Sequence, residues 1–266
     1  MSDGPAAFVD HFASVAADYA RFRPGYPPAL FDFLAGAAPD RELAWDCGTG
    51  TGIAAIPLAE RFSSVVATDA SEAQLAQAPP HPRITWRALR EGSSGLPDHS
   101  ASLVTVAQAA HWFDLDAFYR EVDRVLKPGG VVALWCYGLL AIDARIDRIL
   151  HHFEHGRVGP YWPEERRHVD AEYRTLPFPY ARIATPAFAM EAALTRTALL
   201  GYLGSWSAVS RFRTATGTDP LLELETELAP HWPAPETKVV RWPLTVVVGR
   251  ASGPAPHPRE QSGILR

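Results

Sequence analysis

The chain is poor in cysteine: it has two among 266 residues, Cys47 and Cys136, without the spacing of a disulfide framework or a zinc site. Both lie in apolar or loop contexts, where a reduced thiol acts as a small hydrophobic group. We therefore expect no metal and a reducing, cytoplasmic setting. His151, His152 and His155 lie close together, but no matching acids or cysteines complete a metal site, so we interpret them as exposed helix residues.

Long basic runs and long uncharged apolar runs are also absent. Lys and Arg are scattered and the net charge is −5, which disfavours nucleic acid as a main partner, because phosphate binding needs a concentrated positive surface. No uncharged apolar stretch reaches membrane-spanning length. The first residues, MSDGPAAFVDHF, lack the basic region and apolar core of a signal peptide. We expect neither a nucleic acid nor a membrane as partner.

What the sequence does have, in its first half, is a regular alternation of apolar runs and amphipathic segments. Strands are predicted at 42–46, 63–69, 83–89, 101–110 and 131–137. Helices are predicted at 8–23, 28–37, 53–62, 71–78 and 115–127, with Ser71 and Asp114 as N-caps and KPGG ending the last one. This alternation is typical of an α/β fold with parallel strands and helices on both faces.

The second half of the chain lacks this regular alternation. A helix is predicted at 141–155, followed by an aromatic, basic and proline-rich segment at 156–182 that we interpret as an inserted lid. A strand at 188–194, helices near 195–209 and 219–229, and a final strand at 237–250 complete the prediction. The Pro/Gly-rich tail at 255–266 is expected to be disordered.

The first strand runs into a glycine-rich loop, ELAWDCGTGTGIAAI, with Gly48, Gly50 and Gly52 at every second position. A dinucleotide fingerprint, G-x-G-x-x-G, would place its third glycine at Ile53, and a phosphate-binding P-loop would need a lysine that is missing here. Asp69 ends the second predicted strand, where an acid can accept hydrogen bonds from ribose hydroxyls; the alternative is that it only caps the next helix. The loop therefore favours an adenosine-containing ligand other than a dinucleotide.

An ordered series of motifs resembles the type 11 group of the class I S-adenosylmethionine (SAM)-dependent methyltransferases. The motifs are DCGTGTG (46–52), VVATDAS (65–71), GLPDHSASLVTVAQAAHWFD (95–114) and FYREVDRVLKPGGVVALW (118–135). YARFRPGYP (19–27) and YWPEERRHVD (161–170) resemble the subgroup of trans-aconitate methyltransferases and their relatives. The resemblance covers nearly the whole chain except the tail.

The resemblance implies a Rossmann-like sheet of seven mostly parallel strands with an antiparallel last strand, helices on both faces and an inserted lid. One methyltransferase domain would span 1–254, with cofactor-covering helices at 1–37, core segments at 38–140 and 186–250, and the lid at about 141–185. The cofactor would be SAM, leaving as S-adenosylhomocysteine.

The resemblance also implies cofactor contacts. The methionine part of SAM would be surrounded by Asp46, Gly48, Thr49, Gly50 and Gly52, and its sulfonium would lie near Gln108 and Ala109. Asp69 would hold the ribose, with Ala70 and Leu89 against the adenine. Two positions depart from the family: Cys47 precedes the first glycine, and the acid expected to face adenine aligns with Gly92, which leaves Glu91 as the candidate.

The expected substrate site combines the end of the fourth strand with the lid. His111 is the candidate general base, because an imidazole has a suitable proton affinity; the alternative is a histidine that packs under the lid. The candidate substrate contacts are Trp112, Tyr137, Tyr161, Trp162 and Arg166. Tyr19 and Arg23 belong to the segment expected to fold over the cofactor, and Arg23 could pair with the SAM carboxylate.

The leading hypothesis is thus a SAM-dependent methyltransferase that acts on a small molecule, with a carboxylate as one candidate acceptor. A carboxylate would need no base, whereas a phenol or another hydroxyl would. The alternatives are a nicotinamide-dependent oxidoreductase and a SAM-binding protein without catalysis. The oligomeric state has no signal in the sequence.

Overall fold

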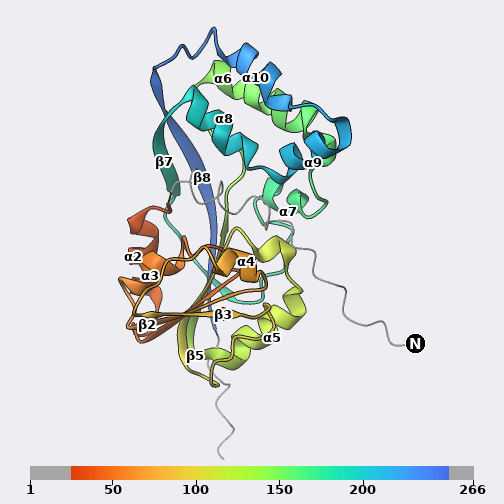
Figure 1. Ribbon diagram of the computed structural model, residues 1–266. Coiled ribbons are helices and arrows are strands. Elements are labelled where there is room, and N and C mark those ends of the chain that lie inside the picture. The colour runs from red at the N-terminus through yellow and green to blue at the C-terminus, as the bar shows by residue number, and fades with distance from the viewer. Residues whose placement is uncertain (1–24, 252–266) are drawn as a thin grey trace, which may run out of the picture.

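The computed structural model describes residues 25–251, so the predictions for helix 8–23, for Tyr19 and Arg23 and for the tail lie outside it. The centre of the fold is one sheet with the strand order β3-β2-β1-β4-β5-β8-β6 (Figure 1). The first five strands are parallel to one another: β1 (Leu43–Cys47), β2 (Ser64–Asp69), β3 (Ile84–Ala88), β4 (Ala101–Ala107) and β5 (Leu126–Cys136). The α/β prediction is confirmed.

The long last strand, β8 (Thr237–Arg250), is antiparallel to β5, as expected. Its second half lies between β5 and the short β6 (Ala181–Ile183), while its first half pairs with β7 (Phe188–Thr195). The sheet therefore has eight strands and not seven, because two successive segments pair along the same side of β8.

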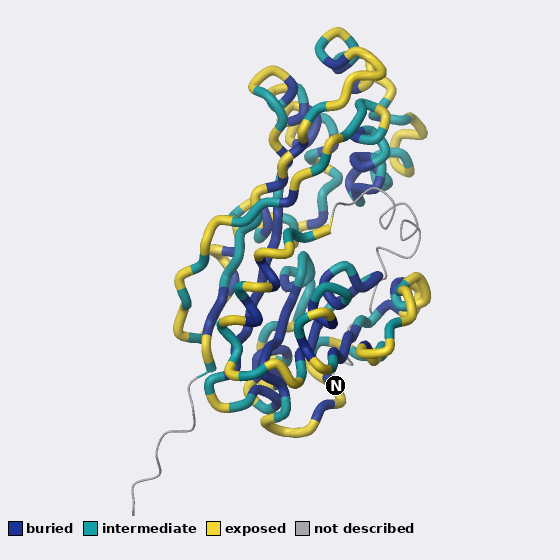
Figure 2. The backbone as a smooth tube through the Cα atoms, turned by 90° about the vertical axis from the view of Figure 1, so that its left-hand side faces the viewer, coloured by how far each residue is buried: buried dark blue, intermediate teal, exposed yellow. Residues whose placement is uncertain are grey.

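Helices cover both faces of the sheet, and the alternation of side chains along β5 shows how. Val131, Ala133 and Trp135 face α2 (Pro28–Ala37) and α3 (Ala55–Ala59). Val132 and Leu134 face α5 (Leu115–Val125), which Asp114 caps as predicted. The short α4 (Glu72–Leu75) follows β2 and has Ser71 as its N-cap. Both faces of the central strands are buried (Figure 2).

Above the sheet, the remaining helices form a cap (Figure 1). They are α6 (Ala144–His151), a π-helical turn η2 (His152–Arg157), η3 (Gly159–Tyr161), α7 (Arg166–Asp170), α8 (Arg196–Gly204), α9 (Ser207–Thr216) and α10 (Pro220–Leu228). Leu150 of α6, Leu203 of α8 and Leu228 of α10 share one buried cluster with Trp242 of β8. The segment predicted as one helix, 195–209, is divided between α8 and α9.

Two boundaries differ from the prediction near the site. β4 ends at Ala107 rather than at 110, and Ala110–Trp112 form a single 3-10 turn, η1. Helix α5 ends at Val125, and the KPGG segment belongs to β5, where Gly129 has a positive φ.

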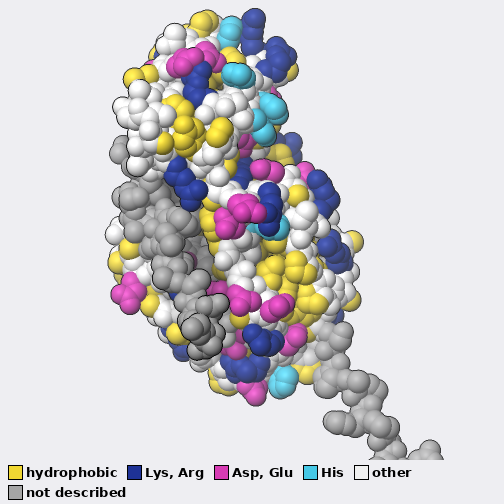
Figure 3. Space-filling view, turned by 90° about the vertical axis from the view of Figure 1, so that its right-hand side faces the viewer, with side chains coloured by type: hydrophobic (Ala, Val, Ile, Leu, Met, Phe, Trp, Pro, Cys, Tyr) yellow, Lys and Arg dark blue, Asp and Glu magenta, His cyan; other side chains and the backbone are white. Residues whose placement is uncertain are grey.

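No helix within residues 25–251 is both long and apolar enough to cross a bilayer. On the face in Figure 3, Lys and Arg side chains are interspersed with Asp and Glu.

Candidate active site

The glycine loop follows β1 at the carboxyl edge of the sheet, and its glycines meet different neighbours. A Cβ on Gly48 would lie 2.7 Å from the Cβ of Ala109, and a Cβ on Gly52 would collide with the Trp86 ring. For a Cβ on Gly50, the nearest atom within residues 25–251 would be Oε1 of Gln74, at 3.8 Å. All three residues have positive φ. Gly48 and Gly52 thus allow the loop to pack closely on the protein, whereas Gly50 is less crowded by the described residues.

Asp46, near the end of β1, holds this loop in place through its side chain. Its side chain is fully buried and accepts hydrogen bonds from the hydroxyls of Thr49 (2.5 Å) and Thr105 (2.7 Å). Burial raises the pKa of Asp46 to about 6, although both hydroxyls lower it. The carboxylate therefore fixes the path of the loop against β4.

Asp69 ends β2 directly opposite the loop. One carboxylate oxygen accepts the N–H of Gly50 (2.7 Å) and the other accepts the N–H of Ser71 (2.8 Å). Ser71 in turn caps α4 by accepting the N–H of Gln74. The carboxylate that was expected at the ribose thus lies between the loop and the start of the next helix.

The residues expected around adenine lie along the ends of β2 and β3. Ala70 and Leu89 are half-buried, and the Leu89 N–H donates to the Asp69 carbonyl. Glu91 accepts a hydrogen bond from the N–H of Asp114 at 3.0 Å, so its carboxylate ties this loop to the start of α5. A Cβ on Gly92, which aligns with the family acid, would lie 3.1 Å from the Cβ of Ala117.

The end of β4 connects the loop to a pocket under the cap. Gln108 has a φ of 56°, which is uncommon for a residue with a side chain. Its side chain accepts the N–H of Tyr137 (2.8 Å) and donates to the Tyr137 carbonyl (3.1 Å), so β4 and β5 are joined at their ends. Ala109, the next residue, contacts Gly48. Gln108 therefore lies between the glycine loop and the pocket.

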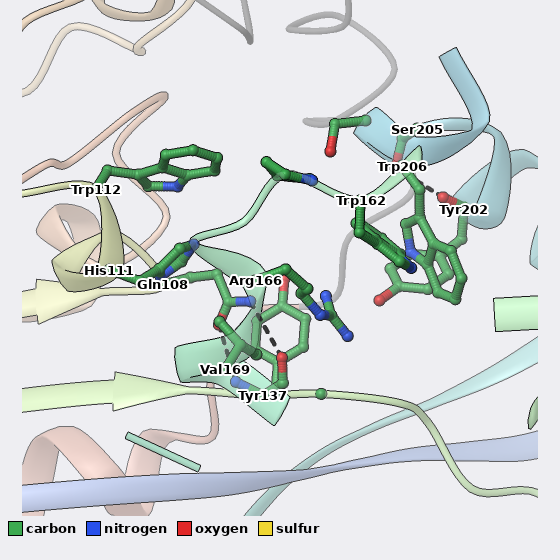
Figure 4. Close-up of a pocket in the computed structure, with 13 residues that line it drawn as sticks. Gln108, His111, Trp112, Tyr137, Trp162, Arg166, Val169, Tyr202, Ser205 and Trp206 are labelled. Atoms are coloured by element: carbon green, nitrogen blue, oxygen red, sulfur yellow. Dashed lines mark hydrogen bonds between the residues drawn. The ribbon is translucent and has the colours of Figure 1, made fainter. Parts of the chain in front are cut away.

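The pocket has mainly aromatic walls and is formed by segments far apart in the sequence (Figure 4). The described residues that line it are Gln108, His111, Trp112, Tyr137, Gly138, Trp162, Pro163, Arg166, Val169, Tyr202, Ser205, Trp206 and Ser207. Five of the six predicted catalytic and substrate residues are among them. Tyr161 is not: its ring packs against Phe212 of α9.

His111 lies on η1, at the sheet side of the pocket. Its Nδ1 is 2.9 Å from the hydroxyl oxygen of Tyr173, and the centre of its ring is 5.0 Å from the ring centre of Trp112. Burial, with Arg166 and His168 nearby, lowers the pKa of His111 to about 3. The imidazole is therefore neutral at physiological pH.

Arg166 enters from α7 and is held on three sides. Its Nη2 donates to Glu154 (2.7 Å), its Nε donates to Asp170 (2.8 Å), and its guanidinium lies 4.4 Å from the Trp162 ring centre. Burial raises the pKa of Glu154. Among the described residues that line the pocket, Arg166 is the one with a full charge at neutral pH.

Sequence reasoning missed one wall of the pocket and the partner of its histidine. Tyr202, Ser205, Trp206 and Ser207 come from the α8–α9 junction, which was expected to belong to the core. Tyr202 and Trp206 are spaced by four residues, a helical pattern that indicates a shared face but not what that face contacts. Tyr173 lies outside every motif that the sequence analysis identified.

Comparison with known proteins identifies the family. A family model described as a methyltransferase domain matches residues 45–134. A protein of Dictyostelium discoideum, provisionally named a methyltransferase, is 33% identical over 230 residues, which cover 84% of this chain and 87% of the relative. The chain belongs to the class I SAM-dependent methyltransferases.

Further relatives agree with this assignment. A solved structure from Anaeromyxobacter dehalogenans, provisionally described as a type II methyltransferase, superposes on the enzyme with a TM-score of 0.83 at 45% identity, covering 87% of this chain and 99% of that one. An uncharacterised methyltransferase of Mycobacterium tuberculosis is 40% identical over 127 residues, 46% of this chain and 50% of the relative.

SAM is the methyl donor of this methyltransferase, and the residues present fit it. Within residues 25–251, no atom lies closer than 3.8 Å to a Cβ built on Gly50, and Asp69 places a carboxylate beside that loop. When bound, SAM supplies an electrophilic methyl group on a sulfonium, so the protein has to orient the acceptor and exclude water.

Proposed function

We propose that the enzyme methylates a small anionic molecule, with a carboxylate as the acceptor group, and that the acceptor binds in the pocket between Gln108 and the cap. The observation that carries the proposal is the position of Arg166, the one charged side chain among the described residues that line a pocket at the end of β4. Gln108 and Ala109 would then lie near the reacting methyl group, between the cofactor loop and the acceptor.

The environment of Arg166 favours an acid over an amine. Two carboxylates already contact the guanidinium, but each attracts it less than a buried carboxylate anion would. Asp170 is half exposed, so water screens its charge, and burial of Glu154 favours its protonated form. A guanidinium has five N–H donors, and within residues 25–251 its Nη1 has no hydrogen-bond partner. An incoming carboxylate would be the natural acceptor for it.

The remaining expected contacts follow from the same arrangement. Asp46, Thr49 and the glycines would enclose the methionine part of SAM, Asp69 the ribose, and Ala70, Leu89 and Glu91 the adenine side. Trp112, Tyr137 and Trp162 would wall the acceptor. A place in the trans-aconitate-like subgroup is part of this proposal, supported by the YWPEERRHVD motif that supplies Trp162 and Arg166.

The direct test is a methyltransferase assay over a panel of small acids, phenols and amines, read by release of S-adenosylhomocysteine. We expect turnover with acids. Preferential turnover of amines would instead mean that the Glu154 and Asp170 carboxylates dominate the pocket, and the proposed acceptor would be wrong.

The chain offers a matched control for Arg166 in its neighbour Arg167. The Arg166 side chain is 14% exposed, whereas that of Arg167 is 62% exposed and pairs with Glu164. Arg166→Lys should raise the KM for the acid roughly 10–100-fold, because a lysine cannot keep the planar pairing with two acids and a third anion. Arg167→Lys should leave KM unchanged. Equal effects of the two variants would contradict the role of Arg166.

A further inference from the structure

Tyr173 contacts His111 from a segment with an unusual backbone. Its ring is 2% exposed, and its hydroxyl lies 2.9 Å from His111 Nδ1. Two consecutive residues with side chains, Glu172 (φ 53°) and Tyr173 (φ 55°), adopt the left-handed conformation just after α7. This conformation is uncommon for such residues, and it persists where the surrounding structure holds it in place. Here it delivers a phenol hydroxyl to the pocket histidine.

The contact bears on which ring nitrogen of His111 carries the proton. A neutral imidazole has one N–H donor and one acceptor nitrogen. The pKa of His111, lowered to about 3 by burial and by Arg166 and His168, keeps the ring neutral. A phenol hydroxyl is a good donor and a poor acceptor, because its lone pair is delocalised into the ring. The favoured arrangement therefore has Tyr173 donating to Nδ1, which leaves the hydrogen on Nε2.

The second ring nitrogen of His111, Nε2, is left available to a molecule in the pocket. Within residues 25–251, Nε2 has no hydrogen-bond partner, and the side chain lines the pocket. In Figure 4 the His111 ring lies below Trp112 and beside Gln108. An N–H at this position would converge with the guanidinium of Arg166 on the same anionic group.

We propose that Tyr173 is a positioning residue that holds His111 as the Nε2–H tautomer, so that His111 donates a hydrogen bond to the acceptor and does not take a proton from it. This inference rests on the proposed function and deepens it. A general base at Nε2 would need the opposite tautomer, with Nδ1–H donating to Tyr173. The position of the ring proton therefore distinguishes the two roles of His111: a proton on Nε2 makes it a hydrogen-bond donor to the acceptor, and a proton on Nδ1 makes it a general base.

The proposed tautomer fits an acceptor that is already deprotonated. One carboxylate oxygen forms the new O–CH3 bond with its own lone pair, the S–CH3 bond breaks with its electron pair passing to sulfur, and no proton moves. The products are a methyl ester and S-adenosylhomocysteine. His111 and Arg166 would hold the carboxylate, and no group would have to accept a proton.

The tautomer can be measured without turnover. In protein labelled with 15N-histidine, long-range 1H–15N correlation spectra distinguish protonated from unprotonated ring nitrogens, and His111→Gln assigns the signal by its loss among ten histidines. We expect Nε2–H, unchanged from about pH 5 to about pH 8. In Tyr173→Phe, a measurable fraction of His111 should adopt the Nδ1–H tautomer. Wild-type enzyme that is mainly Nδ1–H would overturn the proposal.

Tyr119 provides the matched control for losing a buried phenol hydroxyl. Its hydroxyl donates to the Pro177 carbonyl at 2.7 Å and does not contact His111. Tyr119→Phe should leave the His111 signal and the KM for the acid unchanged. Tyr173→Phe should raise KM severalfold while SAM affinity stays constant, which shows that the variant is folded. A tautomer shift of the same size in both variants would count against a specific role for Tyr173.

Turnover separates a donor from a base. Glutamine can donate a hydrogen bond but cannot serve as a base near neutral pH, so His111→Gln should retain most of the kcat/KM that His111→Leu loses, roughly 10–100-fold. Equal loss in the two variants would overturn the donor role. If no acid is methylated but the spectra show Nε2–H, the proposed acceptor class fails while the tautomer assignment stands.

Discussion

Replacing Gly48 with alanine tests how the loop is fitted to the end of β4. The new Cβ would lie 2.7 Å from the Cβ of Ala109 and 3.0 Å from Cζ of Phe113, and Gly48 has a φ of 67°. Carbon atoms attract one another best at about 3.5–4.0 Å, so the loop or η1 has to shift. Because Ala109 adjoins Gln108, the shift would reach both the cofactor loop and the pocket.

The magnitude follows from two costs. Overpacking of this kind costs about 1–3 kcal/mol, and a left-handed conformation with a side chain costs about 1–2 kcal/mol. We expect a loss of about 3 kcal/mol in the free energy of unfolding, which corresponds to a fall in Tm of roughly 6–12 °C for a chain of this size. SAM affinity should fall by about tenfold or more, because part of the shift occurs where the methionine group would bind.

Thermal unfolding and isothermal titration measure the two effects, and two glycines supply controls. Gly50→Ala carries a similar φ penalty but meets nothing closer than 3.8 Å, so it should lose less stability than Gly48→Ala. Gly36→Ala lies in helix α2, where no atom of residues 25–251 comes within 4 Å of the new Cβ, and should be neutral or stabilising by about 0.5–1 kcal/mol. If Gly48→Ala matches Gly50→Ala in both Tm and affinity, the close contact with Ala109 does not control the loop.

Two further substitutions test the carboxylates around the loop. Asp69→Ala should weaken SAM binding about 10–100-fold in titration, because charged hydrogen bonds to the loop and to the ribose are lost; unchanged affinity would show that the ribose assignment is wrong. Asp46→Asn should change the pH dependence of stability. The pKa of Asp46 in the folded protein, about 6, lies above its ordinary value of 3.8, so the stability that this carboxyl contributes falls as pH rises from about 4 to about 6. The variant should lack that fall in unfolding experiments across this range, and an identical slope would contradict the raised pKa.

The parts of the fold that the sequence predicted are those with local causes. Strand β1 is a short buried run, and α5 has a clear apolar stripe with Asp114 accepting the N–H of Ala117. The alternation of such elements was enough for the sheet and its two helical layers. β8 was also predicted in full, since its fourteen residues carry no helix signal, but its two sets of partners were not predictable from its own sequence.

The parts that escaped prediction depend on tertiary contacts. Apolar composition alone continues β4 to residue 110, but the strand ends earlier because Gln108 turns to pair with the backbone of Tyr137. The close approach of Gly48 to Ala109 and of Gly52 to the Trp86 ring was likewise not predictable, because the partners come from distant parts of the sequence. Spacing along the chain contains none of this information.

The two halves of the candidate site differ for the same reason. The proposed donor side comes from consecutive elements, β1, its loop and β2, so a short motif was enough to predict it. The acceptor side combines the ends of β4 and β5 with residues 162–169 and the α8–α9 junction. Gln108 belongs to both sides, because it adjoins Ala109 at the loop and binds Tyr137 at the pocket. Substitutions in the cap can therefore change which acceptor fits while the hydrogen bonds of Asp46 and Asp69 to the loop stay in place, so the acceptor preference can vary while the donor motif stays the same.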